Sequence, residues 1–185
     1  MAPPVRLELG ERSLVLVAGM PGAGKSTLLA GLPADPRVRI LDSDSQRTVL
    51  RRAFPGAPYG LYRWLVHLLH RSGVLCAAMS AAPVVVVHLP ATDPGMRTAV
   101  ARLAAVTGRS AHLLWLHVDP AEALRGQARR GRVVPGASFT RHAAAAADVP
   151  GPSPEWAGVT VLDRERARAG LVLDPPVRHG VRVAQ

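Results

Sequence analysis

Residues 19–27 read Gly-Met-Pro-Gly-Ala-Gly-Lys-Ser-Thr and match the pattern G-x-x-x-x-G-K-[ST]. Glycines let successive backbone N–H groups turn inward around phosphate oxygens, because no Cβ stands in the way. A helix that follows would point the positive end of its dipole at the same phosphates. Lys25 would then reach the β and γ phosphates of ATP, and the Ser26 hydroxyl would ligate Mg²⁺. The residues assigned to this nucleotide site are Gly19, Pro21, Gly22, Ala23, Gly24, Lys25, Ser26 and Thr27.

Lys25 is the one lysine among 23 basic residues, and the other 22 are arginines. The net charge of +10 would ordinarily suggest a polyanionic partner. Abundant arginine, alanine, glycine and proline are instead typical of a GC-rich genome, so we do not take the charge as a sign of nucleic acid. A glycine-rich turn could arise by chance, but a single lysine at this position favours a functional phosphate loop.

Two carboxylates, Asp42 and Asp44, follow an expected strand at 37–41, in the stretch Asp-Ser-Asp-Ser-Gln-Arg. They would lie at the carboxyl edge of a parallel sheet, beside the phosphate loop. A carboxylate there can accept a proton from an attacking hydroxyl or hold Mg²⁺. We assign Asp42 to the metal. The alternative is that both residues only form a turn and cap the next helix.

A third cluster is the arginine-rich stretch 125–132, which reads RGQARRGR. Arginines on a mobile segment can close over the negative charge that builds on a phosphoryl group in transfer. Gly126, Gly131 and Gly136 would allow such a lid to move. The alternative is a solvated basic helix end that interacts favourably with the helix dipole.

Short apolar runs alternate with helical patterns along the chain, which predicts crossover connections and a parallel sheet covered on both faces. The expected strands are 13–18, 37–41, 83–89, 111–118 and 159–162. The expected helices are 25–31, 45–53, 61–81, 94–107 and 120–130. The predicted fold is therefore an α/β, three-layer P-loop NTPase fold with a five-stranded parallel sheet and an arginine-rich lid.

With 185 residues, 48% of them hydrophobic, the chain fits one domain, for which we expect residues 1–174, with 175–185 as a loosely attached tail. The single cysteine, Cys76, excludes an intramolecular disulfide and suits a reducing compartment. The start of the chain lacks the apolar core of a signal peptide. The uncharged stretch 73–91 is interrupted by Pro83 and His88. We therefore expect a cytoplasmic protein that makes no contact with membranes.

The long helix expected at 61–81 carries apolar residues on one stripe, which we interpret as its core-facing side. That stripe is Leu61, Trp64, Leu65, Leu68, Leu69, Leu75, Cys76 and Met79. The opposite side, with Arg63, His67, His70 and Arg71, is interpreted as solvated.

Together these blocks resemble the P-loop kinases, AAA-family ATPase-like proteins related to polynucleotide 5′-hydroxyl kinases, zeta-type toxins and chloramphenicol phosphotransferases. The resemblance covers residues 13–165 and is most specific in the phosphate loop. In that family an Asp-x-x-Arg after the second strand supplies a general base and a substrate-side arginine, which implies these roles for Asp44 and Arg47. The family lid implies Arg130 as the catalytic arginine.

The resemblance implies further contacts as well. Within the lid, Arg125 and Arg129 would bind nucleotide, and Arg97 matches a substrate-side arginine after the third strand. Aromatic residues at 54–64 lie where the family forms a wall of the acceptor pocket, so Tyr59 and Arg63 are candidate acceptor contacts. These aromatics could equally serve only to pack the helical insert onto the core.

The sequence departs from the family at the end of its third strand. The family usually carries an Asp there, whereas this chain reads Val-His-Leu-Pro-Ala-Thr, with His88 and no carboxylate before Asp93. The leading hypothesis is ATP-dependent phosphorylation of a hydroxyl, on a small molecule or a nucleic acid 5′ end. The alternative is a nucleotide-binding regulatory module that turns over little or nothing.

Overall fold

The computed structural model describes residues 3–89, 91–129, 131 and 135–175, without the side chains of residues 43–45. Its centre is a five-stranded sheet in the order β3-β4-β2-β5-β6, in which every pairing is parallel. The strands are β2 (Ser13–Gly19), β3 (Val38–Asp42), β4 (Val84–His88), β5 (Ser110–Leu116) and β6 (Gly158–Leu162). This confirms the predicted α/β class and five-stranded parallel sheet.

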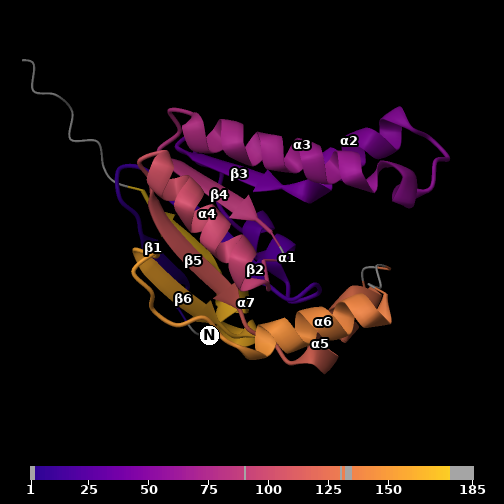
Figure 1. The fold of residues 1–185 in the computed structure, drawn as a ribbon. Coiled ribbons are helices and arrows are strands. Elements are labelled where there is room, and N and C mark those ends of the chain that lie inside the picture. The colour runs from indigo at the N-terminus through magenta and orange to yellow at the C-terminus, as the bar shows by residue number, and fades with distance from the viewer. Residues whose placement is uncertain (1–2, 90, 130, 132–134, 176–185) are drawn as a thin grey trace, which may run out of the picture.

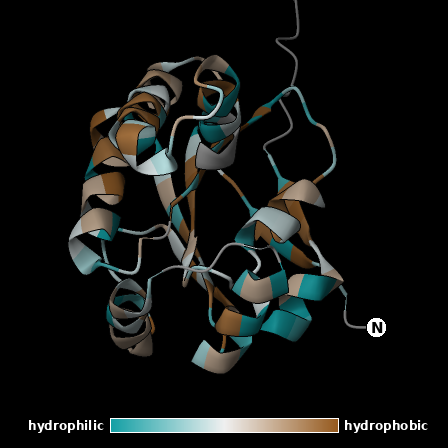
Figure 2. Ribbon diagram, turned by 90° about the vertical axis from the view of Figure 1, so that its right-hand side faces the viewer, coloured by the Kyte–Doolittle hydropathy of each residue, from teal (hydrophilic) through white to brown (hydrophobic). Residues whose placement is uncertain are grey.

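The middle strands are apolar throughout because both of their faces are covered. Every residue of β2 is buried, and the four valines of β4 are fully buried. The colouring of Figure 2 shows hydrophobic residues running through these central strands. Parallel pairing brings all the carboxyl ends to one edge, where Val17 pairs with His88 and His88 with Asp42. The phosphate loop leaves β2 at this edge.

Seven helices connect or cover the strands within the described part of the chain. They are α1 (Lys25–Ala30), α2 (Ser43–Ala53), α3 (Tyr59–Met79), α4 (Pro94–Val106), α5 (Pro120–Arg129), α6 (Gly136–Ala147) and α7 (Arg164–Ala169). The β2-to-β3 connection crosses the sheet in the opposite direction from the next two, so right-handed crossovers place α1 on one face and α3 and α4 on the other. Figure 1 shows α3 and α4 side by side over the sheet. The three-layer prediction holds. No helix in the described ranges has the length and apolar character to cross a membrane.

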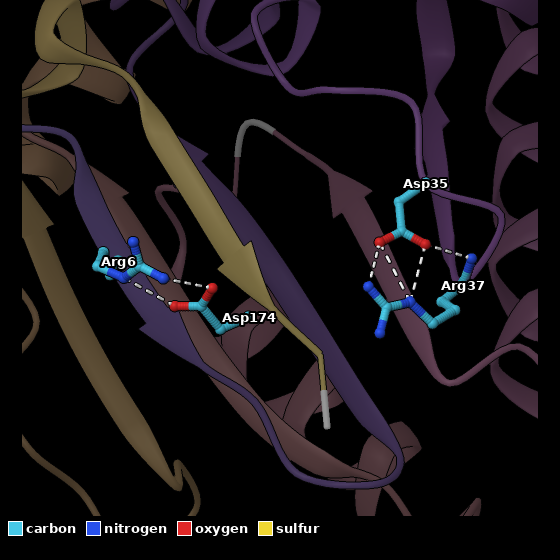
Figure 3. A network of polar contacts seen from close by, with 4 residues as sticks. All are labelled: Arg6, Asp35, Arg37 and Asp174. Carbon is cyan, nitrogen blue, oxygen red and sulfur yellow. Dashed lines mark hydrogen bonds and ion pairs between the residues drawn. The ribbon is translucent and has the colours of Figure 1, made fainter. Parts of the chain in front are cut away.

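Two short strands near the ends of the described chain were not predicted. β1 (Val5–Glu8) pairs in parallel with β7 (Leu171–Asp174) in a separate two-stranded sheet. The guanidinium of Arg6 donates two hydrogen bonds to the Asp174 carboxylate, at 2.9 and 3.0 Å (Figure 3). The same figure shows Asp35 bonded to the guanidinium and the backbone N–H of Arg37, which fixes the turn before β3. Helices α6 and α7 were also not predicted.

The expected core-facing stripe of α3 is wrong. The buried residues of this helix are Tyr62, Val66, His70, Val74, Ala77 and Ala78. Most of the predicted stripe is exposed, Cys76 included, and Leu65 is half-buried. The reason is that α3 is apolar around most of its circumference, so hydrophobic periodicity alone does not select a face. The small residues Ala77 and Ala78 let the helix approach the sheet closely.

Arg109, which directly precedes β5, is only 4% exposed. Its side chain joins four segments at the edge of the sheet where the strands begin. Its guanidinium donates to the carbonyls of Ala78 at 2.7 Å, Ser80 at 2.8 Å and Ala82 at 2.9 Å. A further bond of 3.4 Å reaches the carbonyl of Ser13, where β2 begins. The positive charge thus lies against the negative end of the α3 dipole and satisfies its last carbonyls. Burial lowers the pKa of Arg109 from its usual value.

We expect Arg109→Ala to lower the free energy of unfolding by about 3 kcal/mol or more, because several buried carbonyls would lose their donor at once. Urea denaturation monitored by circular dichroism measures this change. Arg102→Ala is the matched control, since Arg102 is an exposed arginine of α4. A loss at position 109 no larger than that of the control would show that the carbonyl contacts contribute little.

The burial of histidines also makes the stability of the fold depend on pH. It lowers the pKa of His70 on α3, although Asp42 and the backbone of His88 act in the opposite direction, and it lowers the pKa of His112 on β5. Below about pH 6.5 these histidines bind protons in the unfolded chain but remain largely unprotonated in the folded chain. Stability should therefore fall as the pH falls from 7.5 to 5.5.

Urea titrations at pH 7.5, 6.5 and 5.5 measure this loss of stability. His70→Leu removes one of the buried titrating groups, so its stability should depend less steeply on pH than that of the wild type. His117→Gln changes an exposed histidine and should leave the wild-type slope intact. If the stability of His70→Leu depended on pH as steeply as that of the wild type, His70 would not be one of the groups responsible for the pH dependence.

Candidate functional site

The phosphate loop has the backbone conformation that its glycines permit. Gly22 has φ 93° and Gly24 has φ 105°, values that side-chain-bearing residues rarely adopt. Gly24 is the N-cap of α1, and its carbonyl accepts the N–H groups of Thr27 and Leu28. The loop therefore ends directly in the amino terminus of a helix, the arrangement that favours bound phosphate.

Lys25 begins α1 and is only 5% exposed. Its Nζ donates hydrogen bonds of 2.8 Å to the carbonyls of Gly19 and Met20. These bonds hold the ammonium inside the curve of the loop, where an anion can replace or join the carbonyl acceptors. The structure thus places the sole lysine where the motif requires it.

Helix α5 packs directly on the phosphate loop, a contact that sequence reasoning missed. A Cβ added at Gly126 would collide with the carbonyl of Gly22, and one added at Gly22 would collide with that of Ala123. The Gln127 side chain donates a hydrogen bond of 2.9 Å to the carbonyl of Pro21. Gly126, interpreted from sequence as a lid hinge, instead permits a close approach of backbone to backbone.

A cavity of about 450 Å³ opens beside the loop, a size typical of small-molecule sites. The loop and α1 form one side, and α5 and α7 form the rest. Its lining residues include Gly22, Gly24, Thr27, Gly126, Arg129, Arg164 and Arg168. Arg129 was predicted to bind nucleotide. Arg164 and Arg168 were missed because α7 was missed, although the capping aspartate Asp163 before an arginine-rich stretch could have indicated it.

Asp42 and His88 meet at the carboxyl edge of the sheet, with 2.9 Å between Asp42 Oδ1 and His88 Nδ1. His88 therefore lies where the family resemblance led us to expect a carboxylate, and Asp42 lies beside it on β3. For Mg²⁺, which prefers oxygen ligands and keeps several waters, the hydroxyl of Ser26 and the carboxylate of Asp42 are suitable donors. In the described residues no group of three or more His, Cys, Asp or Glu forms a metal site by itself.

The predicted acceptor side is built from α2 and the start of α3. The guanidinium carbon of Arg47 lies 4.4 Å from the centre of the Tyr59 ring, a cation–π contact. Tyr59 packs edge-on against Tyr62, which stacks with Phe54. The aromatics therefore join the two helices, and Arg47 and Tyr59 form one unit. Arg63 is exposed and its Nε lies 3.4 Å from His67 Nε2.

Three other predicted residues fall partly or wholly outside these contacts. The backbone of Asp44 lies in α2, but its side chain, like the whole of Arg130, is outside the described residues. Arg125 is exposed, and its carbonyl accepts a bond of 3.4 Å from Arg129 Nε.

Arg97 is only 8% exposed and donates to the carbonyl of Thr92 at 2.8 Å, with its guanidinium 5.3 Å from the centre of the Trp115 ring. Thr92 Oγ1 also bonds His142 Nδ1 of α6 at 2.7 Å. Burial lowers the pKa of His142, and the nearby charges of Lys25 and Arg141 lower it further. A neutral His142 therefore links α6 to the loop that follows β4. Sequence reasoning missed this contact.

Gly126→Ala should weaken nucleotide binding at least tenfold, because the new Cβ would push α5 away from the phosphate loop. Fluorescence titration with a labelled ATP analogue measures the affinity, and thermal unfolding reports the accompanying loss of stability. Gly136→Ala is the control, since a Cβ there meets open space. Equal affinity in the two variants would show that contact between α5 and the loop is not needed for binding.

Comparison with solved structures supports the fold. A candidate kinase from Chloroflexus aurantiacus matches with TM-score 0.62 and 14% identity, over 83% of this chain and 88% of that chain. A structure from the PezAT chromosomal toxin–antitoxin system of Streptococcus pneumoniae matches with TM-score 0.58 and 15% identity, over 84% of this chain and 69% of that chain. The tunicamycin resistance protein of Deinococcus radiodurans matches with TM-score 0.50 and 18% identity, over 89% and 99%. At such identities the similarity concerns the fold.

No curated protein matches the chain in sequence. Residues 14–148 match the family AAA_33, described as an AAA domain, and this match takes in the phosphate loop, β3, β4, β5 and all of α6. The predicted membership of the P-loop kinase group is thereby confirmed: the chain belongs to the AAA_33 family of AAA domains.

Proposed function

We propose that the protein transfers the γ-phosphate of ATP to a hydroxyl group of an acceptor. The observation that carries this proposal is the buried Lys25, which the Gly19 and Met20 carbonyls hold inside the phosphate loop. Gly22 and Gly24 of the same loop line a cavity together with Arg129, Arg164 and Arg168. Backbone N–H groups, a buried lysine and nearby arginines suit a ligand that carries phosphates. The fold shared with a candidate kinase supports the same reaction class.

The loop N–H groups, the amino terminus of α1 and Lys25 would bind the β and γ phosphates. Arg129, whose side chain lines the cavity, would add positive charge on the opposite side. We assign the same task to Arg125 and Arg130 of the lid. Because negative charge is spread over the phosphoryl oxygens during transfer, donors already in place stabilise that state more than the ground state.

Ser26 and Asp42 are the residues that would hold Mg²⁺, through a hydroxyl and a carboxylate oxygen. The ion, when bound, supplies positive charge that neutralises the nucleotide phosphates. Asp42 must then serve both the ion and its contact with His88.

We assign Asp44, at the start of α2, as the base that accepts the proton of the attacking hydroxyl. The acceptor oxygen forms a bond to the γ phosphorus, and the bond between that phosphorus and the bridging oxygen of ADP breaks. Arg47, Tyr59 and Arg63 would orient the acceptor, and we assign Arg97 to the same task. The cation–π unit of Arg47 and Tyr59 suits an acceptor that is planar, anionic or both.

The acceptor is either a small molecule or the 5′ end of a nucleic acid. A nucleic acid acceptor would bind with a steep dependence on salt, because phosphate contacts release counterions, whereas a small molecule would not. One observation favours a second function, that of a nucleotide-binding regulatory module with little turnover. This observation is His88, whose Nδ1 lies 2.9 Å from Asp42 Oδ1 where the related kinases carry a carboxylate.

Transfer of labelled γ-phosphate from Mg·ATP to a mixed panel tests the reaction. The panel holds DNA and RNA with 5′-hydroxyl ends, nucleosides and hydroxylated small molecules. We expect label in one acceptor class, and at least a hundredfold slower transfer with Asp44→Asn, because the proton of the hydroxyl loses its acceptor.

Calorimetric titration with ATP supplies the control for the same variants. Asp44→Asn should bind ATP almost as well as the wild type, whereas Lys25→Ala should bind it much more weakly. If the wild type binds ATP but labels no acceptor, the regulatory module is the better description. Unchanged ATP affinity in Lys25→Ala would contradict the phosphate-loop assignment itself.

A further inference from the structure

Helix α3 presents a second apolar side to solvent, opposite the side that packs on the sheet. The outer face of α3, as we call it, consists of Leu61, Trp64, Leu68, Leu69, Leu75 and Met79. These side chains are between 42% and 69% exposed. In Figure 1 the helix runs along the upper edge of the molecule, with α2 beside its amino-terminal part and the sheet and α4 below it. A helix with two apolar sides is normally covered on both of them.

The outer face is continuous and contains almost no polar group. It extends over 19 residues, or about 27 Å of helix. Ser72 is the one polar residue within it, and α3 contains no Asp or Glu at all. Leu61, Leu68 and Leu75 follow one another at intervals of seven, the spacing with which helices pack along a common seam.

We propose that the outer face of α3 is the interface of a homodimer, in which it packs against the same face of a second copy. An interface related by a two-fold axis must be self-complementary, and a row of leucines satisfies that requirement. The exposed area of the outer face is also large enough for a dimer interface. Six such side chains offer on the order of 600 Å² per copy and so about 1,200 Å² in all, which reaches the range of specific interfaces.

The charges flanking the outer face decide how the copies are arranged. Arg63, His67 and Arg71 follow one another at intervals of four along a single edge of the face, and all three are exposed. A two-fold axis parallel to the helices places these basic edges on opposite sides of the interface. It also brings each of Leu61, Leu68 and Leu75 beside its counterpart. Each copy carries a net charge of +10, so salt should strengthen association by screening repulsion.

Sedimentation equilibrium of the full chain between 1 and 200 µM tests the proposal. We expect a dimer in the wild type, and at least a hundredfold weaker association in Leu68→Glu. Leu75→Glu should behave in the same way, and thermal unfolding checks that both variants fold. Val106→Glu is the matched control, since Val106 is 80% exposed on α4, outside this face. It should dimerise like the wild type.

Several results would overturn the proposal. One is a wild-type chain that stays monomeric at 200 µM, and another is a dimer that both glutamate variants preserve. A dimer that dissociates as NaCl rises from 50 to 500 mM would point to ionic contacts instead. If a monomeric wild type sediments with vesicles of anionic phospholipid and Leu68→Glu does not, the face binds membranes and the homodimer is wrong.

Discussion

The complete burial of β2 is the constraint on which the rest of the structure depends. A strand covered on both faces and paired on both edges cannot shift without disturbing the whole core. Its carboxyl end therefore provides a fixed point for the phosphate loop, while Arg109 holds the opposite edge through the carbonyl of Ser13. The carbonyls of Gly19 and Met20, at the end of this strand, in turn hold the buried Lys25.

The sequence predicts those parts of the molecule whose chemistry is local. The phosphate loop is recognisable because glycines, a lysine and a hydroxyl must occur at fixed spacing, and the five strands are recognisable as short apolar runs. The caps of α4 also follow from local rules, with Asp93 bonded to the N–H of Met96 ahead of Pro94. All of this agrees with the structure.

The features that were not predicted depend on contacts between residues that are far apart in the sequence. The apolar pattern of α3 fits either side of the helix, so His70 was placed in solvent although it is buried. The pairing of β1 with β7 joins segments at opposite ends of the described chain, and four-residue strands carry little periodicity. Arg164 and Arg168 reach the cavity through α7, an element of only six residues. The capping Asp163 could have indicated the helix, but no local pattern shows that its arginines line the cavity.

The pairing of β1 with β7 has a consequence for biosynthesis. Arg6 and Asp174 are 168 positions apart, and α7 lies directly before β7. While the ribosome is still making the second half of the chain, the phosphate loop has already emerged, but one wall of its cavity does not yet exist. The nascent loop thus exists without Arg164 and Arg168 of α7, which line the completed cavity. The complete cavity therefore forms only after α7 and β7 have been synthesised and β7 has paired with β1.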